Sequence, residues 1–160
     1  TFTVDLPADH APAVTRDEDR QEALQAQAPK AMVLYIEDNA SNIRLMRHIA
    51  QVLGSIDLHV ADEPWEGLEL AARLRPDVIL LDINLPGMDG FEVKARLDAD
   101  VATRDIPVVA ISANVLGDTL ARGQAAGFRG YLTKPISVRA LVDALHEATA
   151  PPMTDGAVNA

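Results

Sequence analysis

The chain has 160 residues, 48% of them hydrophobic, and a formal net charge of −10. This length suits one domain with some additional sequence, and the absence of cysteine excludes disulfides, zinc–thiolate sites and a cysteine nucleophile. The few scattered Lys and Arg argue against a nucleic-acid partner. No apolar stretch reaches the ~20 residues of a membrane span and no signal peptide begins the chain, so we expect a cytoplasmic location without direct membrane contact.

The first 29 residues differ in composition and hydrophobic pattern from the rest of the chain. Residues 1–7 alternate between apolar and polar side chains, which predicts a short strand ending at Pro7. Residues 8–29 are rich in Ala, Pro, Gln and charge and contain little periodic apolar sequence. We predict a linker there, with helix around residues 18–27.

From residue 30 onward, apolar runs alternate with amphipathic segments. Short apolar runs bounded by turn residues predict buried strands, and apolar positions three or four residues apart predict helices. The predicted strands are 31–36, 56–61, 78–82, 106–111 and 129–132. The predicted helices are 40–53, 64–74, 90–97, 115–126 and 137–148. Residues 149–160 are predicted to form a disordered tail.

Strict alternation of strands and helices predicts an α/β fold. Parallel strands need crossover helices, which then cover both faces of the sheet. Right-handed crossovers restrict the possible strand orders, and 2-1-3-4-5 is the common five-stranded, flavodoxin-like arrangement. In such open sheets, ligands bind at the carboxyl ends of the strands.

Polar residues lie at the carboxyl ends of four of the five predicted strands: Glu37 and Asp38 at the first, Asp82 at the third, Ser112 at the fourth and Lys134 at the fifth. With the first and third strands adjacent, three carboxylates would share one crevice and repel one another. A hard cation with oxygen ligands relieves this repulsion, and Mg²⁺ suits a site completed by waters and phosphate oxygens. A nucleophilic carboxylate beside a cation, an ammonium and a hydroxyl is typical of phosphoryl transfer.

Each of these residues also has an ordinary structural explanation when taken singly. Glu37 and Asp38 suit a solvated turn before a helix, and Ser112 suits a turn hydroxyl. Lys134 suits a surface position before Pro135, and Asp82 suits a helix cap. The coincidence of these five polar residues at four strand ends favours the shared site.

Four motifs in residues 30–148 resemble the receiver domain of two-component response regulators. They are Ile36-Glu37-Asp38-Asn39, Leu80 to Gly90 around Asp82, Ile111-Ser112-Ala113, and Tyr131-Leu132-Thr133-Lys134-Pro135. Together these motifs are highly specific, and the resemblance over residues 30–148 covers about three quarters of the chain. The 2-1-3-4-5 strand order is a known property of this family.

The resemblance implies a role for each site residue. Asp82 is the phosphoacceptor, which takes a phosphoryl group from a phosphohistidine. Mg²⁺ is held by Glu37, Asp38, Asp82 and the backbone carbonyl of Asn84. Lys134 pairs with the phosphoryl group.

The resemblance also implies a switch. Ser112 moves to hydrogen-bond the phosphoryl group, Tyr131 swings inward, and the surface around the fourth helix, fifth strand and fifth helix of the domain changes. The Lys134–Pro135 bond is expected to be cis. Two departures from the family pattern are mild: Glu37 replaces the commoner Asp, and Ser112 replaces the commoner Thr.

Residues 1–7 are similar to the closing strand of the ATP-binding domain of histidine kinases. We therefore expect a remnant of that domain at 1–7, a linker at 8–29, a receiver at 30–148 and a tail at 149–160. On this interpretation the chain is the C-terminal receiver of a hybrid sensor histidine kinase. Its phosphodonor is a histidine kinase or a histidine phosphotransfer domain, on the same chain or separate.

Two other functions remain open at this point. A degenerate receiver would act only as a protein-interaction module. A phosphohydrolase would turn over at Asp82, but related enzymes place a second Asp two residues later, where this chain has Asn84. The preferred prediction is a self-phosphorylating switch and not a turnover enzyme.

Overall fold

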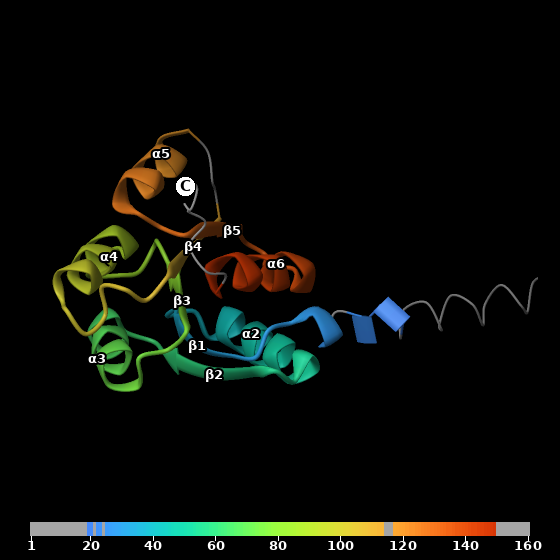
Figure 1. Cartoon of the computed structure of the whole chain (residues 1–160). Helices are drawn as coiled ribbons and strands as arrows, with labels where there is room; N and C mark the ends of the chain where they lie inside the picture. The colour runs from blue at the N-terminus through green and yellow to red at the C-terminus, as the bar shows by residue number, and fades with distance from the viewer. Residues whose placement is uncertain (1–18, 21, 24, 114–116, 150–160) are drawn as a thin grey trace, which may run out of the picture.

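The computed structural model describes residues 19–113, apart from 21 and 24, and residues 117–149 (Figure 1). The predicted strand at 1–7, most of the linker and residues 150–160 lie outside the described residues. The described residues between 19 and 27 are helical, in agreement with the sequence prediction. Within the described part of the chain, no helix has the length and apolar character needed to cross a membrane.

Five parallel strands form a single sheet in the order β2-β1-β3-β4-β5, which confirms the predicted topology. The strands are β1 (Ala31–Ile36), β2 (Ile56–Ala61), β3 (Val78–Asp82), β4 (Val108–Ser112) and β5 (Gly130–Thr133). The central strand β3 is buried along its whole length, as its apolar sequence predicts.

Helices cover both faces of this sheet (Figure 1). They are α2 (Ala40–Leu53), α3 (Pro64–Leu74), α4 (Gly90–Ala99), α5 (Gly117–Ala126) and α6 (Val138–Thr149). Helices α2 and α6 pack on one face, and α3 and α4 pack on the other with α5 beside α4. The sheet is thus closed on both sides, and its strand ends remain free to form a site.

The observed boundaries correct two predicted strands. The predicted strand 106–111 is Val108–Ser112, since Ile106 lies in a turn with its N–H on the Thr103 carbonyl and Pro107 has no N–H to donate. The predicted strand 129–132 is Gly130–Thr133. In both cases pairing continues into polar residues, because the backbone ladder does not depend on side-chain hydropathy.

Helix ends bring the loops of the predicted site into place. The Asn39 side chain caps α2 by accepting hydrogen bonds from the N–H groups of Ser41, at 2.9 Å, and Asn42, at 3.1 Å. The Asp89 side chain caps α4 by accepting from Glu92 N–H at 2.9 Å. Asn39 directly follows Asp38, and Asp89 ends the loop that begins after Asp82, so helix starts and site loops are built together.

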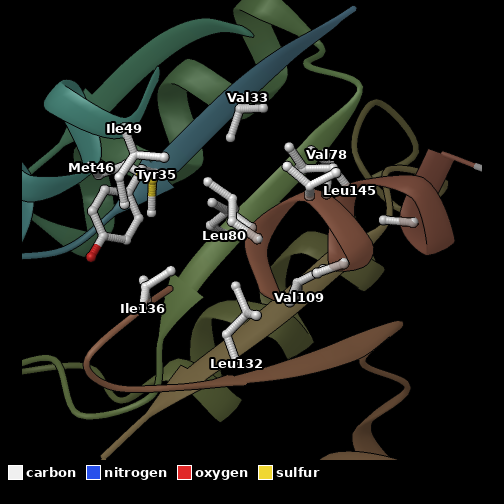
Figure 2. Close-up of a cluster of buried hydrophobic side chains, with 14 of the residues drawn as sticks. Val33, Tyr35, Met46, Ile49, Val78, Leu80, Val109, Leu132, Ile136 and Leu145 are labelled. Carbon is white, nitrogen blue, oxygen red and sulfur yellow. The ribbon is translucent and has the colours of Figure 1, made fainter. Parts of the chain in front are cut away.

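The face beneath α2 and α6 has a dense apolar core. Figure 2 shows Leu80 of β3 among side chains from the neighbouring strands and from both helices. Tyr35 belongs to this cluster and is fully buried beside Met46 and Ile49. Each such side chain contributes about 1.5–3 kcal/mol on burial, so this core anchors the strands whose ends carry the polar residues.

Candidate functional site

Three carboxylates meet at the carboxyl end of β1 and β3. In the register of these strands Ile36 lies opposite Leu81, which places Glu37 and Asp38 beside Asp82. One ligand oxygen from each of the three lies within 4.8 Å of the others. Glu37 and Asp82 are buried, whereas Asp38 is exposed. The predicted crowding of acidic groups is therefore present in the fold.

Lys134 reaches this cluster from the end of β5. Its Nζ lies 3.0 Å from Asp82 Oδ2 and 3.1 Å from Glu37 Oε1. The Lys134–Pro135 peptide is cis, as the family resemblance implies. One ammonium among three carboxylates leaves excess negative charge, and such a cluster of hard oxygen donors fits Mg²⁺.

Burial and mutual contact shift the pKa values of these groups. Burial, together with the contact to Glu37, raises the pKa of Asp82 against the opposing effects of Asn84 N–H and Lys134. Burial also acts to raise the pKa of Glu37, but coupling to Asp82 and hydrogen bonds from Lys134, Asn39 N–H and Tyr35 outweigh it and lower that pKa. The two carboxyl groups therefore titrate as an interacting pair, in which the proton is held preferentially by Asp82.

The pKa of Lys134 responds to the same neighbours. Burial acts to lower it, but hydrogen bonds and charge interactions with Asp82 and Glu37 prevail, so the pKa of Lys134 is raised. Lys134 therefore remains an ammonium and can neutralise an incoming anionic group.

Ser112 and Tyr131 lie on the two strands next to the acidic cluster. Asp82 is paired in register with Ile111, so Ser112 is one residue further along the neighbouring strand and is 4% exposed. Tyr131 is half-buried, and its ring is 6.3 Å from that of Phe128. The fold thus brings Ser112 to the carboxyl end of the sheet with the charged residues, whereas Tyr131 lies within β5, in register with Ala110, and packs on Phe128.

A tight loop joins Asp82 to α4. The Asn84 N–H donates to Asp82 Oδ1 at 3.0 Å, and the Gly90 N–H donates to the Ile83 carbonyl at 2.8 Å. A Cβ on Gly90 would lie 2.6 Å from Ile83 Cα, so the loop can close only on glycine. Gly87 in the same loop has a φ of 82°, which also favours glycine.

Sequence reasoning missed the groups that hold Glu37. Tyr35 Oη donates to Glu37 Oε1 at 2.9 Å, Asn42 Nδ2 donates to the same oxygen at 3.2 Å, and Asn39 N–H donates to Oε2 at 3.2 Å. Burial, with the adjacent Glu37 charge, raises the pKa of Tyr35 far above its ordinary range. The period of two along a strand could have indicated Tyr35, because it shares a side with Glu37.

The comparisons with known proteins agree with this geometry. Residues 33–146 match the model of the response regulator receiver domain. The chain belongs to this family. It is 36% identical over 117 residues to the polar-differentiation response regulator DivK of Brucella anthropi, a match that covers 73% of this chain and 94% of the relative.

Solved receiver structures are similar in fold. The receiver domain of sensor histidine kinase PA1611 from Pseudomonas aeruginosa, solved with a magnesium ion coordinated in the active site cleft, has 27% identity and a TM-score of 0.69. That match covers 76% of this chain and 98% of the PA1611 chain. The chemotaxis protein CheY4 of Vibrio cholerae has the same identity and TM-score, over 74% of this chain and 98% of CheY4. This receiver is therefore a module of two-component signalling.

Proposed function

We propose that this receiver accepts a phosphoryl group on Asp82 from a phosphohistidine of its partner. An Asp82 carboxylate oxygen attacks phosphorus, an O–P bond forms as the N–P bond breaks, and the freed imidazole nitrogen regains a proton from water. The observation that carries the proposal is the placement of the Asp82 carboxylate, which is buried yet held by Lys134 at Oδ2 and by Asn84 N–H at Oδ1.

Mg²⁺ is the proposed cofactor. Glu37, Asp38, Asp82 and the backbone carbonyl of Asn84 would hold it. When bound, the cation supplies positive charge to the phosphoryl oxygens and relieves repulsion among the carboxylates. Lys134 supplies the second positive charge, because its ammonium already lies 3.0 Å from Asp82 Oδ2.

Phosphorylation is proposed to change the surface formed by α5, β5 and α6. A phosphoryl group adds negative charge and acceptor oxygens beside Asp82. The Ser112 hydroxyl would donate to it, and Tyr131 would follow into the space that is vacated. The aromatic packing of Tyr131 on Phe128, which joins β5 to the segment after α5, supports a route from the site to this surface.

The partner is proposed to be a histidine kinase or a histidine phosphotransfer domain in the cytoplasm. A hybrid histidine kinase that carries this receiver remains our proposal for the parent protein, as do the domain boundaries 1–7, 8–29, 30–148 and 149–160. The intact set of Asp82, Ser112 and Lys134 favours a phosphoacceptor over a module that only binds proteins. Asn84 disfavours a phosphohydrolase because an amide cannot act as its acid–base partner.

Acetyl phosphate tests the proposal. The chain is incubated with acetyl phosphate and Mg²⁺ and its intact mass is measured. We expect one labile phosphoryl adduct, lost in Asp82→Asn and in the presence of EDTA. Asp98→Asn is the matched control, because Asp98 lies on α4 in an ion pair with Lys94, and this variant should keep the full adduct.

Two results would contradict the proposal. Absence of any adduct on the unmodified chain would support the interaction module. Rapid multiple turnover of phosphate esters would support a phosphohydrolase.

A further inference from the structure

Tyr35 combines a fully buried ring with a hydroxyl directed to the acidic site. The ring packs beside Met46 and Ile49, and its oxygen points away from the apolar cluster (Figure 2). That oxygen lies 2.9 Å from Glu37 Oε1. The packed ring fixes where the hydroxyl can lie, so the hydrogen bond has little freedom to change direction.

The two oxygens of Glu37 have unequal numbers of donors. Oε1 accepts from Tyr35 Oη at 2.9 Å, Lys134 Nζ at 3.1 Å and Asn42 Nδ2 at 3.2 Å. Oε2 accepts from Asn39 N–H at 3.2 Å. A carboxylate offers about two lone-pair sites per oxygen, so Oε1 has no remaining acceptor capacity and Oε2 retains one site.

We propose that Tyr35 and Asn42 are positioning residues for Glu37. Their hydrogen bonds occupy Glu37 Oε1, so that Glu37 offers only Oε2 to a cation. This inference rests on the proposed magnesium site and adds its supporting shell. Groups that orient a metal ligand affect metal affinity by about 10–100-fold although they do not touch the metal.

The length of the Glu37 side chain explains the need for these two donors. Glutamate has one more rotatable bond than aspartate, so a free carboxylate would lose more conformational entropy on metal binding. Tyr35 approaches from β1 and Asn42 from the first turn of α2, and these two elements together hold the carboxylate in one place. The site therefore tolerates the longer acid because its supporting donors come from two elements.

Lys134 also depends on these donors. It shares Glu37 Oε1 with Tyr35 and Asn42, and it contacts Asp82 Oδ2 as well. With fewer neutral donors on Oε1, the ammonium would be drawn toward Glu37. Tyr35 and Asn42 thereby leave Lys134 available to Asp82 and to an incoming anion.

The test is calorimetric titration of MgCl₂ into the full chain and its variants. Tyr35→Phe keeps the ring and removes only the hydroxyl, and we expect about 10-fold weaker Mg²⁺ binding. In the Glu37→Gln background, whose own affinity is lower, the same change should have no further effect, because the oxygen that it orients no longer bears the charge. Asn42→Ala should also weaken Mg²⁺ binding, because it removes the second donor to Glu37 Oε1.

Thr103→Val is the matched control. It also removes a buried hydroxyl, which donates to the Leu97 carbonyl at 2.7 Å, but at a position away from the acidic cluster. It should lower thermal stability and leave Mg²⁺ affinity unchanged.

Several outcomes would overturn the inference. One is an unchanged dissociation constant for Mg²⁺ in Tyr35→Phe. Another is an equal loss of Mg²⁺ affinity with and without the Glu37→Gln substitution, which would mean that Tyr35 acts through packing and not through Glu37. The third is absence of Mg²⁺ binding by the unmodified chain. If Tyr35→Phe fails to fold, an unchanged affinity in Asn42→Ala would overturn it. A chain that binds Mg²⁺ as expected but forms no adduct with acetyl phosphate would contradict the proposed function and leave this inference standing.

Discussion

The interior of β3 and its last residue are equally buried, but one has apolar neighbours and the other has charged neighbours. Val78 to Leu81 are fully covered by apolar neighbours on both faces of the sheet. Asp82 is only 2% exposed, yet its neighbours are the charged groups of Glu37 and Lys134. The change occurs across one peptide bond, so packing and charge coupling are separated by a single step along the strand.

This difference means that the two regions should respond to different perturbations. Apolar burial is insensitive to ionisation, so the interior should respond to changes of side-chain volume. The carboxyl end holds like charges at short range, so it should respond to pH, to Mg²⁺ and to the removal of a charge.

Leu80→Ala should produce the largest loss of stability. Leu80 has no exposed surface and lies in the cluster between the sheet and helices α2 and α6. We expect the free energy of unfolding to fall by about 3–5 kcal/mol, measured by urea denaturation, because the core cannot close over the cavity. The loss should be the same at pH 5 and pH 8, and a strong pH dependence would contradict the comparison.

Two glycine substitutions should have unequal effects. A Cβ on Gly90 would lie 2.6 Å from the Ile83 backbone beside the site, so Gly90→Ala should destabilise by about 1–3 kcal/mol. A Cβ on Gly123 would lie 2.5 Å from the side chain of Tyr131, which can rotate. At Gly123, the gain in helix propensity of about 1 kcal/mol should offset most of the stability that this close contact costs.

The Gly123→Ala variant should instead displace Tyr131. Incorporated 3-fluorotyrosine would report this as a changed ¹⁹F resonance for Tyr131, with that of Tyr35 unchanged. Equal destabilisation by the two glycine substitutions would show that the site loop is no more rigid than the α5–β5 contact.

Asp82→Asn should have a smaller effect on stability than Leu80→Ala, and with the opposite sign. Because the pKa of Asp82 is raised in the folded chain, ionisation of this group opposes folding, and stability falls as pH rises from the ordinary value of 3.8 through the folded pKa. The variant should therefore gain on the order of 1 kcal/mol at pH 7 in EDTA.

The pH and metal dependence of this gain sharpen the test. In urea denaturation, the difference between Asp82→Asn and the unmodified chain should shrink as the pH falls toward 3.8. Mg²⁺ should also reduce it at pH 7, because the cation binds the native carboxylates. A variant less stable than the unmodified chain in EDTA at pH 7 would show that the Lys134 ion pair outweighs the repulsion.

Most of the fold could be predicted from local patterns. The apolar run that ends in Asp82 identified a buried central strand, and Gly54, with a φ of 74°, ends α2 where the sequence predicts. The errors fell at strand ends such as Ser112, where backbone pairing continues past the last apolar residue. Hydropathy reports burial, and it does not report where a hydrogen-bond ladder stops.

The candidate site was predictable in its charged members and not in their supporting groups. Asp82 and Lys134 were identifiable because polar residues directly after apolar strands are conspicuous. Tyr35 was overlooked because an aromatic residue in a buried strand is ordinary core sequence, although the period of two places it on the same side of the strand as Glu37. Only tertiary packing, which places its ring beside Met46 and Ile49, holds its hydroxyl next to Glu37.

The sequence by itself determined the alternation of elements, the strand order through the family resemblance, and the set of charged residues at the strand ends. Tertiary structure alone decided that one lysine bridges Glu37 and Asp82, that Oε1 of Glu37 is fully engaged, and that the loop after Asp82 closes on Gly90. The physical reason is the distance along the chain over which each kind of interaction acts. Hydropathy and turn propensities act between near neighbours in the chain, whereas a hydrogen bond such as that from Lys134 to Asp82 joins residues 52 positions apart.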